Sequence, residues 1–135
     1  MEKLNKLPPF NLLGYNIQSI VFKRIGEEKL EKINLSIESK EFDKKLKVYS
    51  LLLCLKFDLS DSKENEIKII GGFKINEEKI LEKENNIVSI FAASLFPYIR
   101  STIHNLSSDD REPLNLPVID LRFLDLSHGV SLERE

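Results

Sequence analysis

Residues 86–107, NIVSIFAASLFPYIRSTIHNLS, carry apolar side chains at the spacing of an amphipathic helix, with Arg100, Ser101 and His104 on the other side. The apolar residues of its first half cover more than the ~100° stripe that one sheet face can bury. A second subunit is therefore expected to pack on this helix. Pro97 lacks a backbone donor and predicts a kink or a helix start. The residues expected at the subunit interface are Ile87, Phe91, Leu95, Phe96, Tyr98, Ile99 and Ile103.

The sequence before this helix has the period of β-strands. Residues 15–24, 33–42, 46–59 and 66–76 are rich in β-branched and aromatic side chains or alternate apolar with polar ones. The short connections between them allow only antiparallel neighbours, because a parallel crossover needs a dozen or more residues. Gly71 and Gly72, inside the fourth segment, predict a bulge or a close backbone approach.

After the helix the pattern becomes irregular over residues 107–116. Val118, Leu121, Leu124 and Leu126 then predict a short helix opened by Pro117. The expected fold class is α+β: a four-stranded antiparallel sheet with a long helix, an irregular crossover and a short C-terminal helix on one face. The 135 residues are expected to form a single domain, residues 1–135, with a flexible arm at residues 1–13 and a flexible tail at residues 128–135.

The composition argues against nucleic-acid binding and membrane insertion. The 20 Lys and Arg residues against 22 Asp and Glu leave a net charge of -2, without the excess of positive charge that phosphate binding needs. Cys54 is the single cysteine and lies in an apolar run, which suits a reducing compartment. Residues 1–6 lack the pattern of a signal peptide, and the near-apolar run 87–98 is shorter than the ~20 residues that cross a bilayer. A cytoplasmic protein is expected.

No residue pattern for catalysis or metal binding is recognisable in the sequence. There is no glycine-rich phosphate loop, and His104 and His128 each lack a second ligand at helical spacing. Burial of Cys54 in an apolar strand would make its thiol unreactive. The expectation is that the protein is not an enzyme and binds no metal or cofactor.

Two motifs carry a family resemblance. Residues 95–100 read LFPYIR, and residues 113–117, after the irregular segment, read PLNLP. This combination, preceded by four strands with a Gly-Gly-Phe in the last, resembles the SecB family of protein-export chaperones. The resemblance covers residues 91–118 in motif and residues 12–76 in pattern. It implies a holdase that binds unfolded or preprotein polypeptides, supports protein export and assembles as a homotetramer, a dimer of dimers.

The resemblance also implies an apolar groove for clients between the crossover and the sheet. Pro113, Asn115 and Pro117 are expected to fix the crossover, the prolines through their locked φ. The residues expected to line the groove are Phe42, Tyr49, Leu51, Leu53 and Phe57 from the sheet and Leu114, Leu116, Val118 and Leu124 from the chain after the long helix.

Two other functions fit the same residues. The chain could be a dedicated SecB-like chaperone that holds the antitoxin of a toxin–antitoxin system, or a protein-binding module with no chaperone role. The motor ATPase SecA is a partner of export-type members, which meet it with an acidic sheet surface. Lys23 and Arg24 at the end of the first strand place positive charge there. This difference predicts weak or no binding to SecA.

Overall fold

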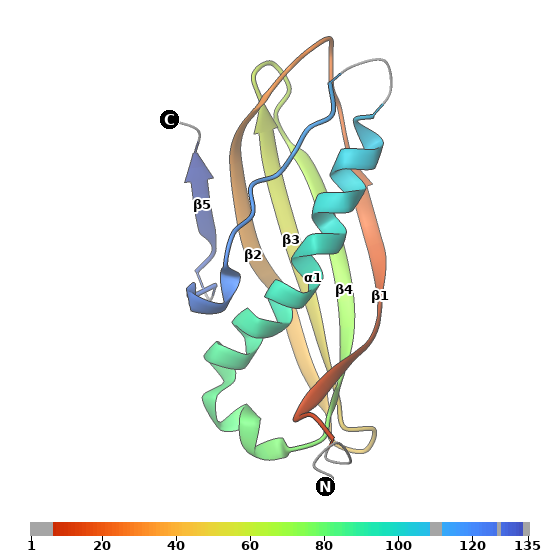
Figure 1. The fold of residues 1–135 in the computed structure, drawn as a ribbon, viewed down its shortest axis with the longest axis vertical. Coiled ribbons are helices and arrows are strands. Elements are labelled where there is room, and N and C mark those ends of the chain that lie inside the picture. Colours follow the sequence, from red (N-terminus) through yellow and green to blue (C-terminus); the bar gives the residue numbers. More distant parts are fainter. Residues whose placement is uncertain (1–6, 109–111, 127, 134–135) are drawn as a thin grey trace, which may run out of the picture.

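The computed structural model describes residues 7–108, 112–126 and 128–133. Four long antiparallel strands, β1 (Phe10–Val21), β2 (Leu30–Asp43), β3 (Val48–Leu59) and β4 (Asn65–Ile75), form the body of the sheet. The short strand β5 (Val130–Glu133) pairs with β2, which gives the order β1-β4-β3-β2-β5. Figure 1 shows the 23-residue helix α1 (Glu84–Leu106) lying along one face of this sheet. The predicted α+β class with a long helix on an antiparallel sheet is confirmed.

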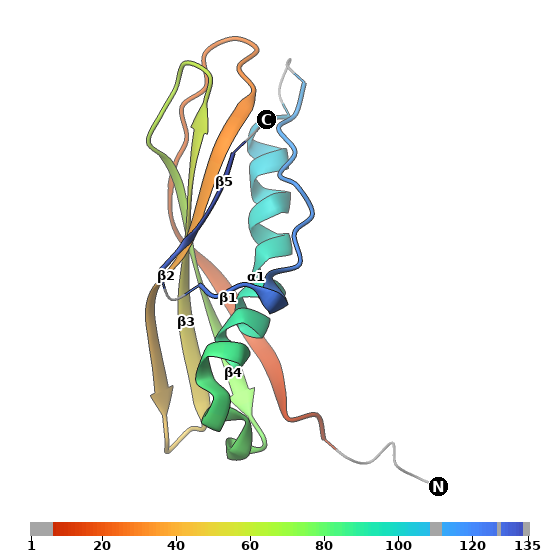
Figure 2. The ribbon, with the colours of Figure 1, turned by 90° about the vertical axis from the view of Figure 1, so that its left-hand side faces the viewer.

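A six-residue 3-10 helix, η2 (Glu78–Lys83), leads into α1, and a single 3-10 turn, η3 (Leu121–Phe123), follows it. Residues 112–120, the crossover segment, have no regular secondary structure and run back along α1 before η3. Figure 2 shows that α1 and the crossover segment lie on the same side of the sheet. Among the described residues, no helix covers the sheet's other face.

The core lies between α1 and the helix-facing side chains of β3 and β4. Alternate side chains of a strand point to the same face, and from Tyr49 to Leu59 every second one is buried. Phe91 of α1 stacks on Phe73 of β4 with ring centroids 4.1 Å apart. Gly71 leaves room for Leu95, whose Cδ2 lies 2.6 Å from where a Cβ at Gly71 would be. The element that approaches this glycine pair closely is a helix side chain rather than a backbone, and it does so at Gly71 alone.

The outer face of the sheet is mixed in character. Leu52 and Ile70 are paired and half-buried there, beside the buried Cys54. Around them Lys68 Nζ lies 2.7 Å from Glu38 Oε1 and 3.5 Å from Glu66 Oε1. The apolar centre is therefore surrounded by charges of both signs.

Three details of the expected architecture are wrong. The sheet has five strands, because residues 130–133, expected in a flexible tail, pair with β2. Instead of a C-terminal helix there is only the turn η3, opened by a backbone donation from Arg122 to the side chain of Asp120. Val118 is 83% exposed, so the apolar residues there do not share one buried helical face. Strand β1 begins at Phe10, inside the expected arm, because Phe10 and Leu12 pair with β4. Residues 1–6 and 134–135 of the expected arm and tail lie outside the described residues.

Candidate functional site

The crossover segment is held against α1 by side chains of the helix's last turns. Ser107 Oγ accepts a hydrogen bond from Leu114 N at 2.8 Å and itself donates to Ile103 O. One turn earlier, His104 Nδ1 lies 2.9 Å from Asn115 Oδ1. Arg100 Nε donates to Leu116 O at 3.4 Å. Burial therefore alternates along the extended PLNLP motif: Leu114 and Leu116 are buried and Asn115 is exposed.

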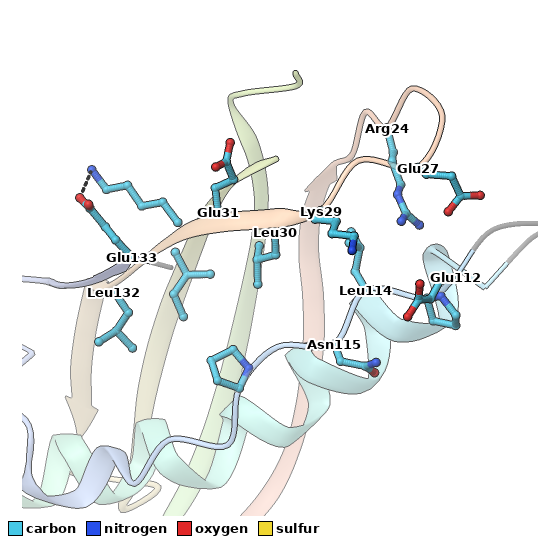
Figure 3. A pocket seen from close by; sticks show the side chains of 14 residues that line it. Arg24, Glu27, Lys29, Leu30, Glu31, Glu112, Leu114, Asn115, Leu132 and Glu133 are labelled. Carbon is cyan, nitrogen blue, oxygen red and sulfur yellow. Dashed lines mark ion pairs between the residues drawn. The ribbon is translucent and has the colours of Figure 1, made fainter. Parts of the chain in front are cut away.

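A groove with a cavity of about 480 Å³ lies between the crossover segment, β2 and β5. Its apolar lining comes from three elements: Leu30 and Ile33 of β2, Leu132 of β5, and Leu114 of the crossover segment. Figure 3 shows Leu30 and Leu132 directed from the sheet toward the crossover segment. Because Leu30 is half-buried and Leu132 is exposed, their apolar surface is accessible to a ligand. The prolines of the crossover segment that also line the groove are Pro113 and Pro117.

The rim of the groove carries charges of both signs. Lys32 Nζ and Glu133 Oε1 lie 3.7 Å apart across the β2–β5 pair, and both side chains are well exposed. Such pairs contribute little because solvent screens them. The other charged side chains of the lining are Arg24, Glu27, Lys29, Glu31 and Glu112. The groove therefore has no single-sign field that would select a charged small molecule.

The loop at the upper end of the groove is fixed by a buried carboxylate. Glu28 is 4% exposed and accepts hydrogen bonds from Ile25 N (2.5 Å), Asp61 N (2.6 Å) and Ser62 Oγ (2.6 Å). The hydrogen bond from Ser62 is the main reason why the pKa of Glu28 lies below its usual value. The Arg24 guanidinium donates to the backbone oxygen of Glu28 at 2.9 Å. This carboxylate ties the β1–β2 loop to the β3–β4 loop.

The sheet residues predicted to line the client groove lie elsewhere. Tyr49, Leu51, Leu53 and Phe57 are at most 2% exposed and form the core beneath α1, and the half-buried Phe42 packs against that core. Tyr49 is fixed there by donating to Glu84 Oε1 at 2.6 Å, and burial raises the pKa of its hydroxyl. None of the five lines the groove. Their role in client binding stays a prediction, and it would require α1 to move away.

Of the four groove residues predicted after the long helix, Leu114 alone lines the groove. Leu116 is buried on the α1 side, at 3% exposure. Val118 points to solvent, and Leu124 borders a separate hollow beside the start of α1. Polar substitution of Leu114 and Leu116 together would therefore test the core as much as any binding surface.

The predicted interface residues are also used mainly within the chain. Ile87, Phe91, Leu95, Phe96, Ile99 and Ile103 are at most 6% exposed and pack on the sheet. Tyr98 is half-buried and stacks on Tyr15 of β1, with ring centroids 4.0 Å apart. Pro97 lies inside α1 and is exposed, so the helix does not start there. Of this set, Tyr98 has the most surface left for a second subunit.

Sequence reasoning missed most of the groove's apolar lining. The sequence pattern places Ile33 in a strand, Leu30 in the connection before it and Leu132 in a flexible tail, and gives none of them a role in binding. The alternation Val130, Ser131, Leu132, Glu133 is a strand signal, but four residues are too few to separate it from a loop. The groove also depends on pairing between residues 32–35 and 130–133, about 100 residues apart in the sequence.

No metal or membrane site emerges from the described part of the chain. Residues 7–108, 112–126 and 128–133 contain no group of three or more His, Cys, Asp or Glu side chains placed to hold a metal ion. None of the helices in these ranges has the length and apolar character needed to cross a membrane.

Comparison with known proteins does not identify a family. No protein-family model matches the chain, and no curated protein matches it. Among solved structures, it is similar to a Streptococcus agalactiae protein of unknown function, with 18% sequence identity. The match covers 81% of this chain and 93% of the other, with a TM-score of 0.31. At that score the similarity carries no argument about function.

Proposed function

We propose that this protein is a SecB-like holdase that binds unfolded or preprotein polypeptides in the groove between the crossover segment, β2 and β5, and catalyses no reaction. The observation that carries the proposal is the apolar lining of this groove: Leu30 and Leu132 have accessible surface on the sheet side, and the buried Leu114 lies opposite them. Burial of apolar surface is non-directional, so such a lining accepts many sequences. Leu114 belongs to the PLNLP motif on which the SecB resemblance rests.

The charged rim supports a polypeptide rather than a small charged ligand. Lysines and glutamates alternate around the groove, so a client segment of either net charge meets comparable surroundings. Contacts at the exposed rim are weak and screened by salt. A holdase benefits from weak contacts, because a client has to be released without a chemical energy source.

Assembly into a homotetramer, a dimer of dimers, is part of the proposal. Strand β1 forms one edge of the sheet and contains no charged residue from Phe10 to Val21. Its exposed apolar residues are Leu13, Tyr15, Ile20 and Val21. Edge strands without charges are templates for pairing with another chain. Several grooves in one assembly would raise overall client affinity through multivalency.

A dedicated chaperone for an antitoxin is the second candidate function. The mixed charges around Lys68 on the outer face favour it, because an export chaperone that meets SecA through acidic residues would have a surface of one sign. Both candidates place the protein in the cytoplasm and use the same groove.

The test is whether the purified chain, without nucleotide, suppresses aggregation of an unrelated protein diluted from denaturant. Leu30→Ser should weaken client binding about fivefold, because part of one apolar side chain's burial is lost. Leu46→Ser is the matched control: Leu46 is 63% exposed and lies outside the groove. Circular dichroism checks that both variants stay folded. If the unmodified chain does not suppress aggregation, the proposal is wrong.

A further inference from the structure

Strand β5 is the weakest-held element of the sheet. It pairs with β2 over only four residues, and its burial is intermediate at Val130 and exposed from Ser131 to Glu133. Its polar side-chain contacts with the described residues include the hydrogen bond from Asn34 Nδ2 to Ser131 Oγ (2.7 Å) and the Lys32–Glu133 ion pair, both at the exposed surface. Segments with few buried apolar contacts and exposed hydrogen bonds open locally at low cost.

The backbone turns at a glycine where β5 begins. Gly129, the residue before β5, has φ +79, a conformation that L side chains rarely adopt. Its N–H donates to Leu126 O, which closes a turn on the buried Leu126. Leu126 before the turn is buried in the core, whereas of the described residues after it only Val130 packs against the core and residues 131–133 are exposed. Rotation at Gly129 would release β5 without disturbing Leu126.

The position of β5 links it to the groove. Leu132 pairs with Ile33 and lines the groove from the same face of the sheet, while Ser131 and Glu133 alternate away from it, with Glu133 at the groove's rim. While β5 is docked, the backbone groups of β2 between Lys32 and Leu35 have a partner strand and Leu132 occupies one side of the groove. When β5 leaves, that stretch of β2 becomes a free edge beside an enlarged apolar groove.

We infer that β5 occupies the client's binding position and that the client displaces it. An extended polypeptide segment then pairs with β2 as an antiparallel strand, with an apolar side chain where Leu132 lies. This inference rests on the proposed function and names its binding mode. Every unfolded polypeptide offers the backbone groups that such pairing uses, so strand addition is tolerant of sequence. The alternation of β5 itself, apolar toward the groove and polar outward, shows which client segments fit.

Docked β5 competes with the client. The apparent client affinity is therefore the intrinsic affinity multiplied by the fraction of molecules in which β5 is released. A disulfide between β5 and β2 tests this. Asn34 and Ser131 are directly paired and their side chains touch at the exposed surface. Paired residues in antiparallel strands have Cα atoms about 4.5–5.5 Å apart, within the range that a disulfide bridges. The variant is Asn34→Cys/Ser131→Cys with Cys54→Ala, which removes the native thiol.

The probe is fluorescently labelled α-lactalbumin, reduced and carboxymethylated so that it stays unfolded and has no thiol. The oxidised variant should bind it at least about tenfold more weakly than the same protein after reduction, because the lock holds the released fraction near zero. Removal of all residues after Gly129 should instead strengthen binding severalfold. Circular dichroism and thermal melting check the fold of the oxidised and reduced forms.

Equal affinity of the oxidised and reduced forms would overturn the inference and leave the holdase proposal standing. The inference would also be overturned if the backbone amides of Ser131 and Leu132 exchanged with deuterium as slowly as the amide of Leu53, in the centre of the sheet. If no form of the protein binds the unfolded probe, the proposed function fails and this inference fails with it.

Discussion

The contact between Gly71 and Leu95 yields the sharpest prediction about how α1 packs on the sheet. A Cβ at Gly71 would lie 2.6 Å from Leu95 Cδ2, 2.9 Å from Cδ1 and 3.2 Å from Cγ. Carbon atoms in good contact are about 3.5–4.0 Å apart, so about 1 Å of space is missing. Leu95 is fully buried, and both its methyl groups and the Cγ that carries them are affected. Gly71→Ala must therefore shift the Leu95 side chain within the core or displace the part of α1 that carries it.

We expect Gly71→Ala to lower the free energy of unfolding by about 1–3 kcal/mol, the range for overpacking a core. Leu95→Ala alone should cost about 2–5 kcal/mol through loss of burial and the cavity left behind. In the double variant each alanine relieves the other's defect, since the methyl group at position 71 enters the space vacated at position 95. The double variant should therefore be more stable than the sum of the single changes predicts, by at least about 1 kcal/mol.

Urea unfolding followed by circular dichroism measures all three variants, and Gly72→Ala is the matched control. A Cβ at Gly72 would face the outer surface and meet only Val48 Cγ1 at 3.7 Å, an ordinary contact. Gly72→Ala should therefore be neutral or slightly stabilising. If Gly71→Ala is as stable as Gly72→Ala, or if the costs of the two single changes simply add, α1 does not pack on the sheet as described.

Three further predictions concern assembly, acid stability and SecA. Ile20→Lys, which places a charge on the uncharged β1 edge, should lower the mass measured by light scattering, whereas Val118→Lys should not; an unmodified chain that stays monomeric at micromolar concentration would contradict assembly. Ionised Glu28 has a lowered pKa, so its stabilising effect is present above pH 4.5, the ordinary value, and is lost as pH falls through the lower folded value. Glu28→Gln should therefore destabilise the fold at pH 7, with a smaller difference from the unmodified chain at pH 3; an equal difference in urea midpoint at both pH values would refute this. Titration calorimetry should detect weak or no binding to SecA at physiological salt, and a dissociation constant in the micromolar range or tighter would contradict that expectation.

Long periodic segments were predictable from the sequence. The helix expected over residues 86–107 is α1, Glu84–Leu106, and the strand expected over residues 33–42 lies inside β2. In α1, burial against the sheet imposes one period along most of the helix, and in β2 the alternation covers Ile33, Leu35 and Ile37; both periods are visible in the sequence. Gly71 was recognisable because a glycine inside a strand is costly unless something approaches it closely.

Short segments and the assignment of apolar residues to sites were less predictable. Val118, Leu121, Leu124 and Leu126 have helical spacing by coincidence: Leu121 and Leu126 are buried separately, and Val118 is exposed. Strand β5 is defined by a partner about 100 residues away, which local periodicity does not reveal. The sequence shows that the strand face with Leu51 and Leu53 is apolar, but it does not show what covers that face. The same pattern therefore fits a client groove and a core. The layer that covers this face is determined by the fold.

The same reasoning explains why the proposed binding surface lies at the periphery. Helix α1 has one sheet face to pack on, and that packing buries its large apolar side chains, Phe91, Leu95 and Ile99 among them. The apolar surface that remains for other molecules includes the β1 edge, the groove and β5. Of these, β5 has the shortest pairing and opens most easily. Under the proposed function, such a chaperone would exchange clients by moving a short strand, while the packing of α1 on the sheet stays intact.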